Sequence, residues 1–362
     1  MQVTAFLSAL QPITAPLSVH RQATLVGLLR GLIFARSVSL AVLGNYLPGC
    51  GQADSNTKRV KRFLKAGLLS KQAILTFVLH WVDTACNGIH LVIDRTDWKG
   101  RRGNHINVFM VAVRYKKGCL PLYWKVFSKA GSSNETQRIE VMQELLRCLG
   151  ERSISSLTAD REFIGERWLN YLIDKQIPFH IRIKSNAVVW HKGQCYNLKQ
   201  LFAHTRQRTY LRLKHQVRVY GCNGYLSGHR RKNSKGNYSY FILLSSHDTK
   251  QARRWYAKRW KIEQMFKDMK SSGFDIEQTG LYLIPRLDQL LSVICIAMVA
   301  VILRGRACAA QKPRLIERLK HKRRRVSIFR LGLDELQRHL DTFVRRWLTD
   351  HSYTSNILLS PT

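Results

Sequence analysis

The sequence predicts an α/β fold in which a three-stranded meander is followed by alternating helices and strands. Three apolar runs with strand character lie between residues 89 and 127, and Lys117–Gly118 is a hairpin signal between the second and third. An amphipathic segment, 134–149, is typical of a helix and ends at Gly150. Strand, helix and strand patterns follow in turn at residues 154–159, 164–175 and 179–183. Hydrophobic residues make up 45% of the chain, so we expect a globular protein with a buried core.

The first 80 residues are expected to be mostly helical. Apolar residues recur there at helical spacing, and Pro48–Gly49 interrupts the pattern. Within residues 57–64 an apolar stripe leaves four cations on the opposite side of a helix, namely Lys58, Arg59, Lys61 and Arg62. This segment is a candidate DNA-contacting helix, although a solvated helix face would give the same pattern.

Basic residues far outnumber acidic ones: 60 Lys and Arg against 23 Asp and Glu give a formal charge of +37. Residues 175–247 contain 14 Lys and Arg and no Asp or Glu, and residues 98–134 contain eight Lys and Arg and no acid. Such one-sign stretches indicate a positive surface that follows a polyanion, and double-stranded DNA is the first candidate. A membrane surface, or charge that only keeps the protein soluble, is the alternative.

The segment 185–240 is expected to be a small basic sheet that binds DNA. Cations alternate with apolar residues in 210–214 and again in 217–219, as they would on a sheet with one basic face. Residues 229–235 have the composition of a flexible basic loop, with Arg230, Arg231 and Lys232 at its centre. These three cations are therefore candidate DNA contacts.

Several other function classes lack support in the sequence. The longest apolar run, 290–303, is shorter than a membrane span and fits a buried core helix, so no membrane partner is expected. Residues 1–16 carry no basic leader, which favours a cytoplasmic protein. The eight cysteines are scattered without paired metal-binding spacing and are expected to be reduced thiols. No glycine-rich phosphate loop occurs, so no nucleotide cofactor is expected.

Two aspartates each follow a predicted strand directly. Asp94 comes after the apolar run 91–93, and Asp160 comes after residues 157–159. Strand ends hold side chains rigidly, and carboxylates are the hard ligands that Mg²⁺ and Mn²⁺ prefer in phosphodiester cleavage. Each aspartate taken alone could equally be a turn or helix-cap residue. Asp97 is a rival to Asp94, but Asp94 is nearer the predicted strand end and is preferred.

A third acid, Glu263, lies on a long helix expected over residues 252–269. Tyr256, Glu263 and Lys270 are seven residues apart and therefore nearly in line, and Arg259 is one turn before Glu263. An adjacent apolar stripe can pack this helix on the sheet and direct Glu263 toward the sheet edge. The alternative is an exposed Arg259–Glu263 pair on a solvated helix face.

The spacing of these four residues resembles the signature of the DDE transposases of bacterial insertion sequences, which include the Tn-five and Tn-ten enzymes. That signature is Tyr, two residues, Arg, three residues, Glu, six residues, Lys, and it stands here as Tyr256, Arg259, Glu263 and Lys270. Residues 159–163, Ala-Asp-Arg-Glu-Phe, are similar to the second-aspartate motif of the same family.

The resemblance implies a ribonuclease-H-like catalytic core with a β-rich insertion, preceded by a helical N-terminal DNA-binding region. Residues 43–48 and 58–64 are more loosely similar to that N-terminal region. Five regions are therefore expected: helical DNA-binding residues 1–80, a first part of the core at 81–184, the basic insertion at 185–240, a second part of the core at 241–305, and a basic helical C-terminal region at 306–362.

The same resemblance implies roles for individual residues. Asp94, Asp160 and Glu263 would hold Mg²⁺ or Mn²⁺, two ions per active site, and Tyr256, Arg259 and Lys270 would contact phosphates near the transposon end. Arg161, in the second-aspartate motif, is a further expected DNA contact. Family members stack a Trp on a flipped base from the strand before the catalytic helix; this chain has Phe241 there, and Trp260 is the other candidate.

The function that the resemblance implies is cut-and-paste transposition. A dimer or larger assembly would act on paired terminal inverted repeats, with water and then the freed 3′-hydroxyl as nucleophiles. One alternative is a ribonuclease-H-like nuclease that cuts without joining. The other is a catalytically silent DNA-binding protein, which the intact signature disfavours.

Overall fold

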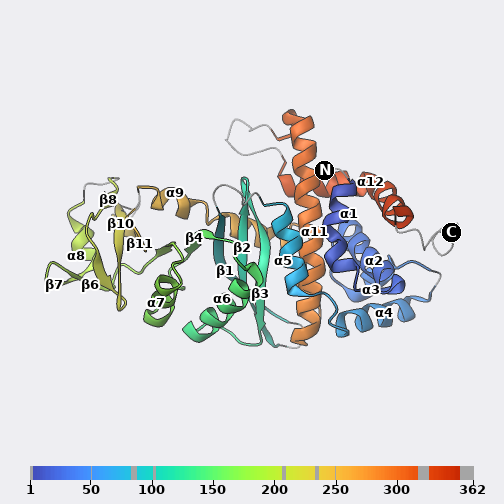
Figure 1. The fold of residues 1–362 in the computed structure, drawn as a ribbon, viewed down its shortest axis with the longest axis horizontal. Coiled ribbons are helices and arrows are strands. Elements are labelled where there is room, and N and C mark those ends of the chain that lie inside the picture. Colours follow the sequence, from blue (N-terminus) through green and yellow to red (C-terminus); the bar gives the residue numbers. More distant parts are fainter. Residues whose placement is uncertain are drawn as a thin grey trace.

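The computed structural model describes residues 3–49, 51–82, 88–100, 103–205, 209–232, 236–248, 250–316 and 326–350 of the 362-residue chain (Figure 1). A mixed sheet runs through the middle of the molecule, with a helical lobe at one end and a smaller β-rich part at the other (Figure 1). This arrangement confirms the predicted α/β class.

The central sheet contains the predicted meander followed by two parallel strands. Strands β1 (Ile89–Lys99), β2 (His105–Tyr115) and β3 (Gly118–Phe127) are antiparallel, while β4 (Ile154–Ala159) and β5 (Phe179–Arg182) run parallel to β1. Their spatial order, β3-β2-β1-β4-β5, is consistent with a ribonuclease-H-like core.

Helix α6 (Glu135–Leu149) lies between β3 and β4 in the chain, and α7 (Glu166–Asp174) lies between β4 and β5, as the sequence predicts. Helix α6 begins at Asn134, whose side chain forms a capping box with Gln137, and it ends at Gly150. Helix α7 buries Trp168.

The β-rich insertion continues the sheet instead of standing apart from it. Strand β11 (Tyr238–Ser245) pairs with β5 on one side and with β10 (Cys222–Lys232) on the other. The remaining elements of this part are β6 (Val188–His191), β7 (Gln194–Asn197), α8 (Leu198–Ala203), β8 (Leu211–Arg212) and β9 (Val217–Val219). The expected flexible loop at 229–235 is wrong over residues 229–232, because these residues pair with β11; residues 233–235 lie outside the described part.

The expected single helix over 252–269 is two helices, α9 (Ala252–Ala257) and α10 (Lys261–Met269). Between them the backbone tightens into three-residue turns: Arg259 N–H donates to Tyr256 O at 2.8 Å, and Ile262 N–H donates to Arg259 O at 3.0 Å. The change in direction lets α9 pack on β4 and β5 while α10 packs on β1 and β3.

The helical lobe combines both ends of the chain around one long helix, α11 (Ile284–Gln311). Around it lie α1 (Val3–Thr14), α2 (Val19–Ala35), α3 (Leu40–Gly44), α4 (Ala53–Lys65), α5 (Lys71–His80) and α12 (Ile328–Asp350) (Figure 1). Helix α11 contacts α2, α4, α5 and α12, and it also packs on β3. The N-terminal and C-terminal regions thus share a core, although the sequence predicts them as separate regions.

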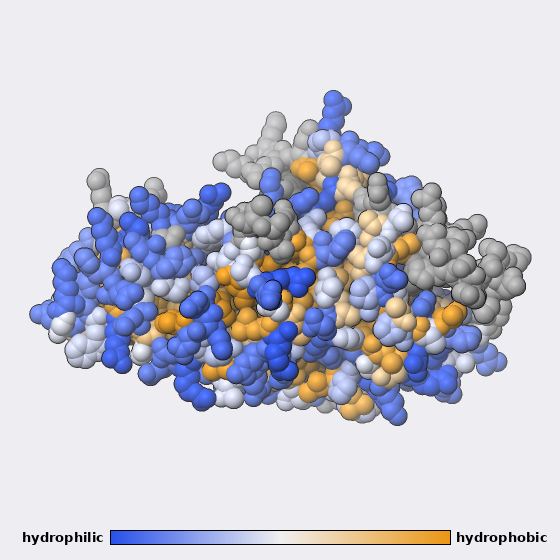
Figure 2. Space-filling model, in the orientation of Figure 1, coloured by the Kyte–Doolittle hydropathy of each residue, from blue (hydrophilic) through white to orange (hydrophobic). Residues whose placement is uncertain are grey.

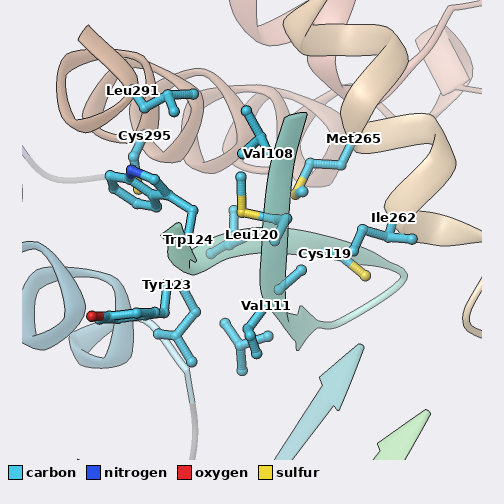
Figure 3. Packing of buried hydrophobic residues seen from close by; sticks show 14 of the residues in the cluster. Val108, Val111, Cys119, Leu120, Tyr123, Trp124, Ile262, Met265, Leu291 and Cys295 are labelled. Carbon is cyan, nitrogen blue, oxygen red and sulfur yellow. The ribbon is translucent and has the colours of Figure 1, made fainter. Parts of the chain in front are cut away.

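Helix α11 is the only helix of the described residues that is long and apolar enough to cross a membrane, and 78% of its most apolar window is buried inside the fold. Figure 3 shows how it joins the core: Leu291 and Cys295 lie next to Trp124 of β3, and Met265 of α10 reaches the same cluster. The helix has the character of a buried core element, as the sequence predicts.

Six cysteines fall within the described residues, and all six are free. Cys119, Cys222, Cys295 and Cys308 are buried. Burial raises the pKa of the Cys119 thiol to about 12, so this thiol stays protonated. Cys50 and Cys86 lie outside the described part of the chain.

Candidate active site

Two acids meet where the parallel pairing of β1 and β4 ends. The last paired residues are Ile93 and Ala159, and the next residue on each strand is an aspartate, Asp94 and Asp160. Residues in register on neighbouring parallel strands point to the same face. The fold therefore brings together two acids that are 66 positions apart in the sequence.

The structure separates Asp94 from its rival Asp97. Strand β1 continues through both residues to Lys99, so the expectation that it ends at Asp94 is wrong. Because side chains alternate along a strand, Asp94 and Asp97 point to opposite faces. Asp97 has 56% of its side chain exposed and pairs with Arg95 at 3.2 Å, whereas Asp94 is 16% exposed and faces the turn between α9 and α10.

Arg259 links two of the predicted acids. Its Nη1 lies 2.8 Å from Asp94 Oδ2 and its Nη2 lies 2.6 Å from Glu263 Oε1. The third acid is held by the tyrosine of the signature, because the Tyr256 hydroxyl donates to Asp160 Oδ1 at 3.0 Å. Arg259 also lies over the Tyr256 ring, 5.6 Å from its centroid. All three acids therefore belong to one connected group.

The fourth signature residue, Lys270, lies at the end of α10 and away from the three acids. Its Nζ pairs with Glu277 Oε1 at 2.7 Å and donates to Asp97 O at 3.3 Å. It also lies 5.9 Å from the centre of the Trp98 ring. Lys270 therefore borders the site from the side of β1.

Burial and neighbouring charges shift the pKa values of Asp94 and Asp160 in opposite directions. Burial raises the pKa of Asp94 to about 6, although the Arg259 guanidinium and the Arg95 backbone N–H act against it. Burial also acts to raise the pKa of Asp160, but the Arg161 backbone N–H, Arg259 and the Tyr256 hydroxyl outweigh it. The pKa of Asp160 consequently lies below its usual value.

A cavity of about 310 Å³ opens beside these acids. Its walls are mostly aromatic and cationic, and they consist of His229, Phe241, Arg253, Tyr256, Ala257, Arg259 and Trp260. Phe241 packs edge-on against Tyr256 with ring centroids 5.3 Å apart, and His229 lies 5.4 Å from Phe241 on its other side. Trp260 is 57% exposed at the rim. Four of the predicted DNA contacts therefore line one cavity, namely Phe241, Tyr256, Arg259 and Trp260.

Sequence reasoning missed His229 and Arg253 as parts of this cavity. His229 pairs directly with Phe241 across the β10–β11 ladder. Arg253 lies on α9 one turn before Tyr256, so helical spacing from the signature tyrosine could have identified it.

The other predicted DNA contacts differ in how far their side chains are exposed to solvent and free of hydrogen bonds within the protein. Arg161, Arg231 and Lys232 are exposed. Arg230 is partly engaged, because its Nε donates to Thr205 O at 2.8 Å and its guanidinium lies over the Tyr238 ring. Figure 2 shows a mostly hydrophilic surface over the β-rich part of the molecule.

The cations of α4 are likewise of two kinds. Lys61 and Arg62 are exposed, and Lys58 forms an exposed pair with Asp54 at 2.9 Å. Arg59 donates instead to Thr24 Oγ1 at 3.0 Å and to Pro48 O at 3.1 Å. Its guanidinium therefore connects α2 to the turn before α4, which does not fit the predicted DNA contact.

The three acids suit a hard divalent cation by the chemistry of their donors, which are all carboxylate oxygens. Asp94 and Glu263 already face a common cationic group, the Arg259 guanidinium. Within the described residues, no three acidic, histidine or cysteine side chains are close enough to surround one ion as they stand. Asp94, Asp160 and Glu263 are thus a suitable donor set that Arg259 partly occupies.

One acid lies within a central strand, a second directly follows the neighbouring parallel strand, and a third lies on a later helix. In an α/β core this arrangement is consistent with a nuclease or polynucleotide-transfer class of protein. The family model described as the transposase DDE domain matches residues 87–300 of this sequence. The chain belongs to this family, whose members act as nucleases and transposases and generally use divalent metals.

Comparison with other proteins adds little to this assignment. No curated protein matched the sequence. The crystal structure of the NurA nuclease from Sulfolobus solfataricus aligns with 67% of this chain and 93% of its own, at 10% identity and a TM-score of 0.26. A TM-score this low does not indicate a shared fold.

Proposed function

We propose that this transposase excises its element by cutting both ends and then joins the freed 3′-hydroxyls to target DNA, as a dimer on paired terminal repeats. The observation that carries the proposal is the connected group of Asp94, Asp160 and Glu263, held together by Arg259 and Tyr256. The same three carboxylates serve both steps, because hydrolysis and transfer each displace one oxygen at phosphorus.

Asp94, Asp160 and Glu263 would hold Mg²⁺ or Mn²⁺. When bound, such ions supply positive charge for the attacking and leaving oxygens of the phosphodiester. The protein contributes rigidity, since Asp94 lies on β1 and Asp160 directly follows β4, the neighbouring strand in the middle of the sheet. Glu263 comes from α10, which packs on β1 and β3.

The cavity beside the acids would hold a nucleotide of the transposon end. Its aromatic residues Phe241, Tyr256 and Trp260 offer ring faces and edges for a base that has left the duplex. Arg253 and Arg259 line the same cavity and suit the adjoining phosphates. Exposed cations of the insertion, Arg231 and Lys232, would extend this contact along the DNA backbone.

The test is the effect of Glu263→Gln on Mg²⁺-dependent nicking of a duplex that carries the terminal repeat. If Glu263 holds a metal ion, replacing a charged oxygen ligand by an amide should abolish nicking. Binding of the duplex should persist, because glutamine keeps the shape of the side chain and removes a negative charge from a basic surface.

The matched control is Glu151→Gln, the same substitution at an exposed turn residue after α6. Glu151→Gln should nick and bind like the wild type. If Glu263→Gln also nicks at the wild-type rate, Glu263 is only half of a helix ion pair, whose loss costs a few tenths of a kcal/mol, about 0.3–0.5. The active-site assignment is then wrong, and a protein that only binds DNA becomes the better description.

A further inference from the structure

We propose that Arg259 is an exchangeable counter-ion that couples metal binding to DNA binding. In the DNA-free protein its guanidinium neutralises Asp94 and Glu263, and a DNA phosphate in the adjacent cavity draws it away, which opens the two carboxylates to a divalent ion. The inference rests on the proposed function of these acids and adds the order in which their ligands bind.

The first observation is that one guanidinium serves two of the acids. Arg259 Nη1 is 2.8 Å from Asp94 and Nη2 is 2.6 Å from Glu263, each at hydrogen-bond distance. Divalent ions bind carboxylate oxygens at about 2.0–2.6 Å. A divalent ion and a guanidinium at the same oxygens would repel each other at short range in a half-buried site. The two cations therefore compete for Asp94 and Glu263.

The second observation is that Arg259 also borders the cavity. It is one of the residues that line this space of about 310 Å³, together with Arg253 and Tyr256. The guanidinium thus has carboxylates on one side and a space suited to an anion on the other. Planar arginine groups bind phosphate through two parallel hydrogen bonds, so the cavity side can compete with the carboxylates.

The third observation concerns a donor of Arg259 that the carboxylates do not use. Its Nε–H is buried and has no hydrogen-bond partner among the described residues. A buried donor without an acceptor costs about 1–3 kcal/mol. Once the guanidinium has turned toward the cavity, a phosphate oxygen there would supply the missing acceptor, which favours the exchange when DNA is bound.

Among the residues that the structure describes, no other cation forms an ion pair with Asp94 or Glu263. Lys270 is engaged with Glu277 at 2.7 Å. Arg182 lies on the far side, 4.0 Å from Asp160 and 5.7 Å from the centre of the Phe241 ring. When Arg259 moves to phosphate, Asp94 and Glu263 lose their counter-ion together, and a divalent ion can take its place.

Thermodynamic linkage gives the consequence. If DNA raises the affinity for the ion by some factor, the ion raises the affinity for DNA by the same factor. The exchange makes the metal site strong only when a strand occupies the cavity. A chain with a charge of +37 meets DNA of every sequence, so this device would restrict cutting to correctly seated ends.

The test measures the affinity of the full chain for Mn²⁺ in the absence of DNA, by titration calorimetry. Removing the competing guanidinium in Arg259→Ala should tighten Mn²⁺ binding by about tenfold, within the usual range of coupling effects. Arg254→Ala is the matched control, because it removes the same charge from an exposed position of α9, and its Mn²⁺ affinity should equal that of the wild type. Arg259→Gln, which keeps more of the volume, replaces Arg259→Ala if melting curves show that the alanine variant is unfolded.

The titration is then repeated at 4 °C with a duplex of the terminal sequence present, and Mn²⁺ binding is measured before cleavage products accumulate. The duplex should tighten Mn²⁺ binding by the wild type and have little effect on the Arg259 variant. Unchanged or weaker Mn²⁺ binding by the Arg259 variant overturns the inference. Asp94→Asn separates this failure from that of the proposed function. If Asp94→Asn abolishes Mn²⁺ binding, the metal site stands even where the exchange fails; if it has no effect, both fail.

Discussion

At the scale of single residues, two charged side chains face the inside of the fold and not the solvent. Arg59 connects α2 to the turn before α4, and Asp268 lies inside α10 with only 6% exposure. The only side-chain hydrogen bond to Asp268 within the described residues comes from Gln264 Nε2 at 3.0 Å. Burial raises the pKa of Asp268 to about 6, so neutral pH keeps an ionised carboxylate in an apolar setting.

Asp268 predicts a pH dependence of stability. A carboxyl whose pKa is higher in the folded state contributes stability that is complete below its unfolded pKa and is lost as pH rises through the folded value. The wild type should therefore lose up to about 3 kcal/mol of unfolding free energy between pH 3 and pH 7 relative to Asp268→Asn. Urea unfolding of both proteins at several pH values measures this difference. An equal difference at pH 4 and pH 7 would contradict the buried carboxyl.

The identity of the three acids could be predicted at this scale, because each sits at a recognisable position of a strand or helix. Their partners could not. The contact between Arg259 and Asp94 spans 165 positions, and local spacing carries no information about it. For the same reason Arg59 was grouped with the DNA-binding cations, since its acceptors Thr24 and Pro48 belong to other segments.

At the scale of elements, one turn and one helix crossing determine how the neighbouring helices pack. The turn at 258–260 redirects α9 into α10 and places Arg259 between the acids and the cavity. In the helical lobe α11 and α12 cross at glycines, since a Cβ on Gly332 would collide with Val301 O and one on Gly305 with Ile328 O. Backbones in such contact leave no room for a side chain.

The crossing predicts an unusual response to alanine. Glycine to alanine within a helix normally stabilises by roughly 0.5–1 kcal/mol, because glycine has more conformational freedom to lose. Gly332→Ala should instead destabilise the protein by about 1–3 kcal/mol, as overpacking does. Thermal unfolding measures the change, with Gly118→Ala as control because its nearest contacts lie at 3.8 Å. A Gly332→Ala protein more stable than wild type would show that the helices do not cross here.

Element boundaries were predicted well where a cap or a glycine marks them, as at Asn134 and Gly150 of α6. The sequence does not predict a boundary where the backbone geometry changes without a change in the pattern of apolar residues, or where the reverse holds. Beyond Asp94, strand β1 continues because it still pairs with β2, although its pairing with β4 has ended. The residues of this outer half do not form a continuous apolar run, so the sequence pattern of a buried strand stops too early. The turn between α9 and α10 keeps helical periodicity and therefore looks like uninterrupted helix in the sequence.

At the scale of the whole molecule, the charge is concentrated where acids are missing. The insertion from 185 to 240 has no Asp or Glu, and its strands extend the sheet beside which Asp94 and Asp160 meet. The acid-free segment is thereby joined through the sheet to the candidate active site. Composition was enough to predict a polyanionic partner, whereas the joining of both chain ends around α11 was not predictable, because an apolar stripe does not specify its partner helix.

The concentrated charge predicts how DNA binding responds to salt. Each phosphate contact releases about 0.9 counterion, so log affinity falls linearly with log salt concentration. Arg231→Gln with Lys232→Gln should reduce that slope by up to about two units, because both cations are exposed on β10. Arg147→Gln with Arg152→Gln, near the end of α6 opposite the acids, is the control and should leave the slope unchanged. Equal slopes for both double variants would place the DNA away from β10.

The measurement that tests the central claim most directly is strand transfer from a pre-cut end. A duplex that carries the terminal repeat and a free 3′-hydroxyl is incubated with plasmid, Mg²⁺ and either the wild type or Asp160→Asn. We expect joined product with the wild type and none with Asp160→Asn, while both bind the duplex equally, because Asp160 serves the chemistry and not the docking. Joining by Asp160→Asn at the wild-type rate, or no joining by a wild type that binds and nicks the same end, would contradict the assignment of these acids to transposition.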